Sequence, residues 1–98
     1  MSDYRAPIKD MRFVMDELAG FKELSSLPGL EEATPDLADA ILDEAAKFSG
    51  EVIAPLNRVG DQQGCQLGAD GVSTPAGWKE AYAQYRDAGW NGITLPPE

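Results

Sequence analysis

The residue types that carry most enzyme chemistry are sparse in this sequence. Cys65 is the single cysteine, and the chain contains no histidine that could serve as its base. A nucleophilic cysteine needs a neighbouring group that lowers its pKa or accepts its proton. Nothing close to Cys65 in the sequence supplies such a group, so we predict that this thiol is structural or idle. A single cysteine also forms no intrachain disulfide, which is typical of a reducing, cytoplasmic compartment.

Acidic residues offer two further candidates, and neither fits its chemistry. Glu31 and Glu32 are adjacent, whereas paired carboxylates for acid–base catalysis must face each other. We interpret this pair as a solvated start to the next helix. A calcium loop that began at Asp61 would need an oxygen ligand where Cys65 stands and an acid where Val72 stands. The sequence has neither a dinucleotide fingerprint nor a P-loop, so we assign no catalytic, cofactor-binding or metal-binding residue.

Methionines and aromatic residues recur at helical spacing and could form binding surfaces. Met11 and Met15 belong to one apolar stripe, which could be an adaptable partner surface. Trp78, Ala81, Tyr82 and Tyr85 form an apolar and aromatic stripe, whose rings could stack on bases or other rings. Both spacings are more typical of helix faces that pack in a core, and we favour that interpretation for both stripes.

Three main helices and a glycine-rich loop are predicted to position these side chains. The first helix begins at Pro7 and stops at Gly20, and Phe13 lies off its main stripe. Phe13 therefore predicts apolar contact on two sides of this helix. Thr34 is a good cap for the second helix, with Pro35 at its first position.

Pro55 falls inside the apolar pattern of the second helix. A proline costs about 3 kcal/mol in a helix interior, so the helix either kinks there and continues or stops near Ile53. The apolar phase continues to Leu56 and Val59, which favours a kinked helix that continues.

The third helix repeats the capping pattern of the second. Thr74 is predicted to cap it, Pro75 to take its first position and Gly89 to end it. The preceding glycine-rich stretch predicts a loop with a hairpin-like turn at residues 69–71.

Composition limits the partners of the chain. Its 98 residues fit one small domain, and the hydrophobic fraction of 43% argues against wholesale disorder. Aspartate and glutamate outnumber lysine and arginine 17 to 8, for a net charge of −9. Phosphate backbones and anionic lipid surfaces repel such a chain, so we expect no nucleic-acid partner and no membrane role. No apolar run reaches the roughly 20 residues of a membrane span, and the first residues lack the basic region of a secretory signal.

Residues 52–98 carry four motifs in fixed spacing, which read "APLN", "GD..G", "TP.G…AY" and "GW.G…P.E". In this spacing they resemble the N-terminal helical region of bacterial acyl-CoA dehydrogenases. The earlier stretch "YRAPIKDMRFVMDEL" resembles an extra N-terminal segment of one bacterial subgroup, which includes methylmercaptopropionyl-CoA dehydrogenases. The resemblance implies an all-α fold class with an N-terminal extension over residues 1–33. Residues 34–98 are then the first part of the helical domain, cut after Glu98.

The resemblance also implies an activity for a larger parent enzyme. Acyl-CoA dehydrogenases use FAD to oxidise the α,β-bond of acyl-CoA thioesters in fatty acid metabolism. A glutamate base removes the α-proton, and an electron-transferring flavoprotein reoxidises the flavin. In this family the base and the main flavin contacts come from other domains, so we carry no residue over and expect no FAD in this chain alone. The implied partners are the remainder of the enzyme, the acyl-CoA substrate and a second copy in a homo-oligomer.

The alternative interpretation is a free-standing acidic helical interaction module. An acyl carrier protein would need a serine at a helix start for its prosthetic group, but the stretch at residues 25–27 runs into Pro28 and Gly29. The two interpretations differ in what they predict for the apolar side chains. Three helices present more large apolar groups than one thin layer can cover, so a piece of a larger enzyme should expose an apolar patch.

Overall fold

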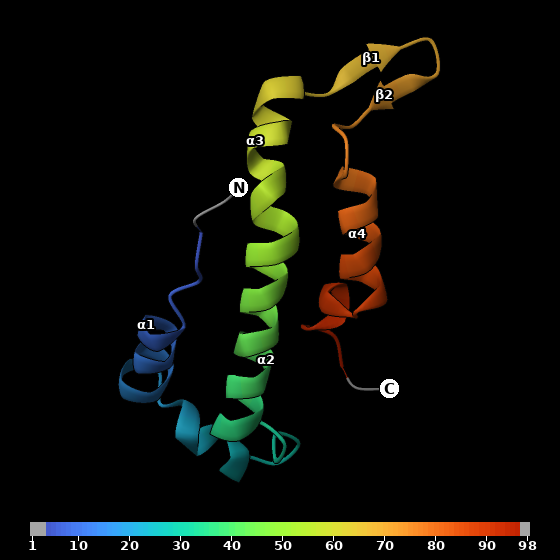
Figure 1. Cartoon of the computed structure of the whole chain (residues 1–98). Coiled ribbons are helices and arrows are strands. Elements are labelled where there is room, and N and C mark those ends of the chain that lie inside the picture. The colour runs from blue at the N-terminus through green and yellow to red at the C-terminus, as the bar shows by residue number, and fades with distance from the viewer. Residues whose placement is uncertain (1–3, 97–98) are drawn as a thin grey trace. The chain divides into compact units, whose positions relative to one another are not determined.

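The computed structural model describes residues 4–96, and these residues are mostly helical (Figure 1). The predicted all-α fold class is confirmed, and two of the four α-helices in the described range lie in the span of the predicted second helix. In chain order the elements are α1 (Ile8–Phe13), a π-helical segment (Val14–Leu18), a 3-10 segment (Phe21–Ser26), α2 (Pro35–Phe48), a second π-helical segment (Ser49–Ile53), α3 (Ala54–Gln63), strands β1 (Gln66–Gly68) and β2 (Gly71–Ser73), α4 (Trp78–Asp87) and a 3-10 turn (Trp90–Gly92).

The chain divides into two compact units, residues 1–51 and residues 52–98. These units are defined by contacts within the chain. The predicted boundary between residues 33 and 34 is of another kind, because it separates an N-terminal extension from the start of a family domain, and it stays a prediction. The two units are described separately below.

The first predicted helix is present but changes its winding partway. α1 is followed at once by the π-helical segment, whose wider turn is closed by the Ala19 amide donating to the Val14 carbonyl at 2.9 Å. Gly20 ends the helix with a φ of +67°, as predicted. The side chain of Phe13 is 61% exposed. The expected apolar contact on two sides is therefore wrong, because no element in the described part of the chain covers Phe13.

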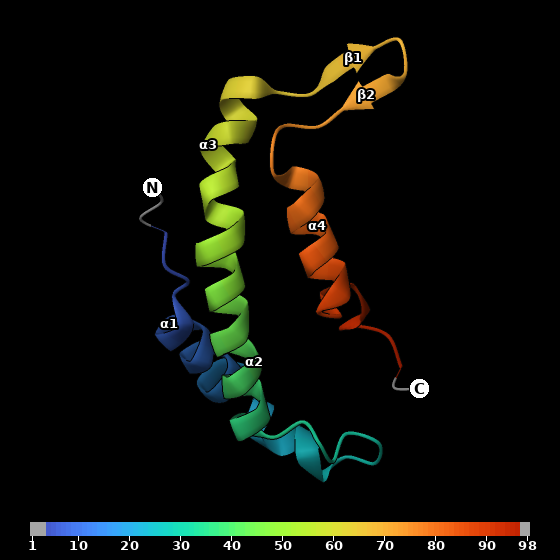
Figure 2. The ribbon, with the colours of Figure 1, turned by 45° about the vertical axis from the view of Figure 1, so that its right-hand side comes forward.

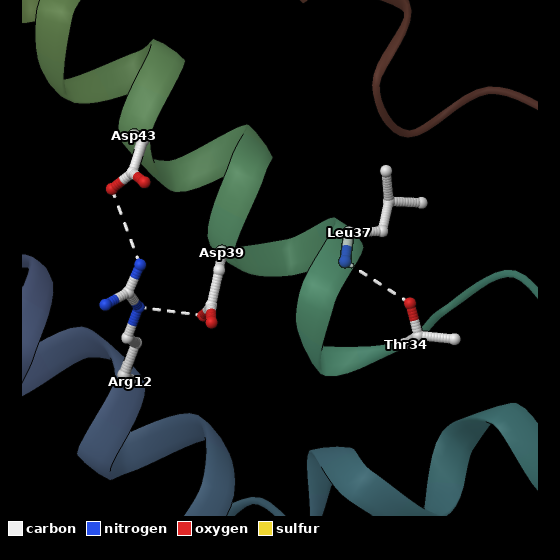
Figure 3. Close-up of polar contacts among 5 residues, drawn as sticks. All are labelled: Arg12, Thr34, Leu37, Asp39 and Asp43. Carbon is white, nitrogen blue, oxygen red and sulfur yellow. Dashed lines mark hydrogen bonds and ion pairs between the residues drawn. The ribbon is translucent and has the colours of Figure 1, made fainter.

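The N-terminal cap of α2 is confirmed. The Leu37 amide donates to Thr34 Oγ1 at 3.2 Å, and Pro35 holds the first helical position (Figure 3). Thr34 itself has extended backbone angles, which lets its side chain turn back toward the helix. Asp36 in the first turn places a negative charge at the positive end of the helix dipole.

The helix continues past Pro55, as the apolar phase predicted. Residues 49–53 form the second π-helical segment, and α3 contains both Leu56 and Val59. A proline has no amide hydrogen, and its ring clashes with the carbonyl four residues earlier in an α-helix. A wider π turn directly before Pro55 gives the ring room while the helix goes on. The kink itself stays a prediction.

A two-stranded antiparallel hairpin joins α3 to α4 (Figure 2). The hairpin-like turn predicted at residues 69–71 is thus confirmed and flanked by short strands. Leu67 pairs with Val72 and Gly68 with Gly71, whose φ of +108° a side chain would strain. A clasp at the base of the hairpin holds its ends together, because the Ala76 amide donates to Gln63 Oε1 at 3.0 Å.

α4 begins at Trp78, three residues later than predicted from the Thr74–Pro75 pair. Gly77 has a φ of +85°, a left-handed conformation that breaks the helical geometry directly before Trp78. The amide of Ala76 is already bonded to Gln63 and takes no part in a cap. The predicted roles of Thr74 as cap and Pro75 as first helical residue are therefore wrong. Pro75 is instead buried beside the hairpin base.

Candidate docking surfaces

The apolar side chains of this chain are largely uncovered. Among the described residues, 4–96, only Pro75 and Ala81 are buried. A folded domain of this size normally encloses a contiguous core of large side chains. Here the large apolar residues that remain exposed are Tyr4, Phe13, Val14, Leu18, Leu27, Leu30, Leu37, Ile41, Ile53, Leu67, Val72, Trp78, Tyr82, Tyr85, Ile93 and Leu95. Each unit therefore presents apolar surface.

In the second unit, Trp78 fixes α4 against α3, and both views show the two helices side by side (Figures 1 and 2). Its indole Nε1 donates to the Leu56 carbonyl at 3.3 Å. The ring lies so close to Gly60 that a Cβ there would be 3.1 Å from Trp78 Cε2 and would overlap Cζ2. A Cβ on Gly77 would likewise come within 2.9 Å of a Leu56 methyl group. The two helices can approach this closely because both positions are glycine.

A groove of about 380 Å³ opens beside this joint. It is lined by Ile53, Leu56, Asn57, Trp78, Ala81, Tyr82 and Tyr85. Trp78 is 42% exposed and Tyr82 is 60% exposed, while the Tyr82 and Tyr85 rings stack with centroids 6.2 Å apart. The expectation that the aromatic stripe packs in a core is therefore wrong for the described chain. Only Ala81 of this stripe is buried, and the aromatic rings form the wall of an open groove.

In the first unit, Arg12 links α1 to α2 (Figure 3). Its Nε lies 2.8 Å from Asp39 Oδ1, and its Nη2 lies 3.4 Å from Asp43 Oδ1. The Nε–H does not point along the line to Asp39, so this short contact is ionic rather than a well-aligned hydrogen bond. The three side chains are 39% to 66% exposed. Solvent therefore screens the pairs, and they set the position of α1 with modest energy.

The first unit also contains a larger apolar groove of about 620 Å³. Its lining comprises Met15, Phe21, the segment 29–34, Leu37, Ala38, Ile41 and Leu42. A second recess of about 410 Å³ is lined by Asp10, Met11, Val14, Met15 and Leu42. Met15 borders both hollows, Met11 borders the smaller one, and both methionines are half-buried on one face of the helix.

The acidic pair of the sequence lies at the edge of the larger groove. Both carboxylate oxygens of Glu31 accept from the Gly29 amide, at 3.1 and 2.9 Å. This hydrogen bonding holds the pKa of Glu31 below its ordinary value, because it stabilises the ionised form. Glu31 and Glu32 are both exposed in the turn that precedes α2, as predicted. Glu31 directs its oxygens at the backbone, which is a structural role rather than an acid–base role.

The remaining sequence candidates lie in places that give them no partner for chemistry. Cys65 is an exposed thiol between α3 and β1. Asp61 belongs to the last turns of α3, where a calcium-loop conformation is not available. Within residues 4–96, no three His, Cys, Asp or Glu side chains gather closely enough to hold a metal ion. None of the helices in that range has the length and apolar character that a bilayer crossing requires.

Two comparisons of the sequence with known proteins were made, one with family models and one with single proteins. No protein-family model matches this chain. The chain is 38% identical over 95 residues to 3-methylmercaptopropionyl-CoA dehydrogenase from Ruegeria pomeroyi (strain ATCC 700808 / DSM 15171 / DSS-3). The aligned region is 97% of this chain but 16% of the relative. The predicted resemblance is confirmed: nearly the whole chain is similar in sequence to one part of an acyl-CoA dehydrogenase.

Proposed function

We propose that this chain is a helical scaffold portion of an acyl-CoA dehydrogenase, whose catalytic and flavin-binding parts lie in the rest of the enzyme. The observation that carries the proposal is the asymmetry of the sequence match, which spans 97% of this chain and 16% of the relative. A segment of that relative size contributes surface and support to a larger fold. The parent enzyme would oxidise an acyl-CoA thioester in the cytoplasm and pass electrons to an electron-transferring flavoprotein.

The uncovered grooves support this role. An independent acidic module needs a core of its own, whereas each unit here leaves large apolar side chains half exposed or more. Burying apolar surface contributes roughly 25 cal/mol per Å². Contact with further elements of an enzyme would therefore stabilise both units. The apolar surplus fits a scaffold segment better than a free-standing interaction module.

The chemistry of the two grooves supports a FAD site in other parts of the parent enzyme. Bound FAD supplies the hydride acceptor in this class of reaction. Its pyrophosphate needs backbone amides at a helix N-terminus or cationic side chains. The groove of the first unit has Glu31 and Glu32 in its lining, and that of the second has apolar side chains, aromatic side chains and Asn57. Neither lining fits a pyrophosphate, which supports a docking role for the two grooves.

A segment exchange tests the proposal. The aligned part of the Ruegeria pomeroyi relative is replaced by residues 1–98 of this chain, and the purified hybrid is assayed for bound flavin and for dehydrogenation of the relative's own thioester. We expect flavin content close to that of the unmodified relative and activity within about tenfold. The readouts are the flavin absorption band after gel filtration and thioester-dependent bleaching of that band.

Two controls make the exchange decisive. A hybrid that carries an unrelated acidic three-helix segment of the same length should lose flavin and activity. A hybrid with Gly60→Trp should also lose them, because the joint between α3 and α4 cannot form around a second indole. Equal performance of the unrelated segment, or loss of flavin in the unmodified hybrid, would refute the scaffold role.

A further inference from the structure

The larger groove of the first unit has the form of a helix-binding site. Leu37 and Ile41 stand one turn apart on α2 and line the groove while remaining 45% and 36% exposed. Met15 and Phe21 line it from the π-helical and 3-10 segments. A volume of about 620 Å³ has room for several aliphatic side chains. Grooves of this kind accept the apolar face of an amphipathic helix, which inserts side chains at i, i+3, i+4 and i+7.

The charge around this groove is one-sided. Residues 1–51 contain twelve aspartates and glutamates against five lysines and arginines. Two of the five cations are paired within the unit, since Arg12 contacts Asp39 and Asp43 and Lys47 lies 3.6 Å from Glu44. Glu31 and Glu32 line the groove itself, and no lysine or arginine is among its described lining residues. The bonds from the Gly29 amide hold the pKa of Glu31 low, so this edge stays negative well below neutral pH.

We propose that the 620 Å³ groove of residues 1–51 binds an amphipathic helix whose apolar stripe is flanked by lysine and arginine. Electrostatic complementarity selects this partner, because apolar contact alone would accept a helix of any charge. A second copy of this chain is a poor occupant, since its groove carries the same negative edge. Nucleic acid and anionic membranes are repelled for the same reason. The source of the helix rests on the proposed function: it belongs to the part of the dehydrogenase outside this chain.

Model peptides test the groove directly on the 98-residue chain. The probe is a fluorescently labelled amphipathic helix of about 14 leucines and lysines. One comparison peptide has the same composition in scrambled order, and another has glutamate in place of every lysine. Fluorescence anisotropy gives the affinities at low and high salt. We expect the basic amphipathic peptide to bind at least about tenfold more tightly than either comparison peptide.

Two matched pairs of variants locate the binding. Glu32→Lys reverses a charge in the groove lining, while Asp70→Lys makes the same change in net charge at the hairpin turn. Leu37→Ser removes an apolar side chain from the groove, while Leu67→Ser removes one from β1. The groove variants should each weaken binding by about fivefold or more, and the hairpin variants by less than about twofold.

The outcomes separate this inference from the scaffold role. Equal binding of the basic and acidic peptides would overturn it, and so would equal effects of the paired variants or no binding of the basic peptide. Sedimentation that shows a dimer blocking the peptide would assign the groove to a second copy instead. The segment exchange reports on the enzyme and not on these peptides. If the segment exchange fails but the basic peptide still binds selectively, the groove prefers a basic amphipathic helix. That helix then does not come from the rest of a dehydrogenase.

Discussion

The indole ring of Trp78 occupies the space that a side chain at Gly60 would need. A Cβ at position 60 would lie 3.1 Å from Cε2 of the ring and would overlap Cζ2. The same ring donates its Nε1–H to the carbonyl of Leu56, one turn earlier on α3. Helix α3 therefore offers Trp78 both an acceptor and a gap, and one missing methyl group sets the distance between α3 and α4.

Gly60→Ala should destabilise the second unit. Alanine improves helix propensity by about 1 kcal/mol, but overpacking costs about 1–3 kcal/mol and the indole hydrogen bond contributes about 1 kcal/mol. We expect a net loss of about 1–3 kcal/mol in the free energy of unfolding, measured by urea titration with tryptophan fluorescence. Both tryptophans, Trp78 and Trp90, lie in this unit. The control is Gly92→Ala in the same unit, where the nearest atom to an added Cβ is a Leu95 methyl carbon at an ordinary 4.0 Å. A gain in stability for Gly60→Ala would contradict this packing.

Two threonines that look alike in sequence should differ in their effect. Thr34→Ala removes a side-chain cap from α2 and should cost about 1 kcal/mol. Thr74→Ala should cost less than about 0.5 kcal/mol, because α4 begins after Gly77 without a side-chain cap. Thr34→Ser should retain most of the stability. Thermal unfolding followed by far-ultraviolet circular dichroism measures all three, and equal losses at positions 34 and 74 would mean that α4 is capped after all.

Arg12→Ala should weaken the contact between α1 and α2. The ion pairs with Asp39 and Asp43 are partly exposed, so we expect a loss of about 0.5–1 kcal/mol that shrinks at high salt. Lys47→Ala is the matched control, since its pair with Glu44 joins residues of the same helix and should contribute less than about 0.5 kcal/mol. Urea titrations at low and high sodium chloride test both. A loss that does not change with salt would assign the role of Arg12 to its packing alone.

The isolated chain should bind a hydrophobic dye and self-associate at micromolar concentration. Residues 52–98 carry the whole lining of the aromatic groove and a small share of the negative charge, so we expect association through that unit. Tyr82→Glu places a charge on an exposed groove side chain and should shift sedimentation toward the monomer. Leu18→Glu, in the first unit and outside both of its described hollows, is the control. A monomer that binds no dye would support the free-standing module.

Cys65→Ser should leave the activity of the hybrid dehydrogenase within about twofold, because the thiol is exposed and the chain has no histidine to act as its base. Cys65→Ala separates loss of the thiol from any effect of a new hydroxyl. Turnover with the thioester substrate is the measurement. A loss of a hundredfold or more in both variants would assign a function to this thiol.

Local signals predicted the fold well where they act within a few residues. Thr34 and Pro35 began α2 as expected, Gly20 ended the first helix, and the apolar phase carried the second helix past Pro55. The capping pattern at Thr74 gave a wrong start for α4. The helix begins only after Gly77, and the Ala76 amide donates to Gln63, a contact that a pattern of neighbouring residues does not reveal.

Contacts between helices could not be predicted from such local sequence patterns. A glycine within the pattern of α3 was the one hint of close packing at Gly60, and nothing in the sequence named Trp78 as its neighbour. The stripes of Met15 and Tyr82 were recognised as apolar faces, but periodicity says only that a face is apolar. The resemblance to one part of a larger enzyme predicted an exposed apolar patch, but which faces stay open depends on surface from elsewhere, so the residues that line the two grooves could not be predicted.

The hydrogen bond between Gln63 and Ala76 closes the base of the hairpin, so the turn between its strands can be changed without separating α3 from α4. Leu67 and Val72 are 83% and 69% exposed, so the strands contribute little packing to the unit. In addition to the pairing of the strands, the ends of the hairpin are held by the 3.0 Å bond at its base. Lengthening a closed loop costs only about 0.6 kcal/mol for each doubling. The turn at Ala69 and Asp70 is consequently a place where an epitope or a fluorophore can be inserted while α3 and α4 keep their pairing.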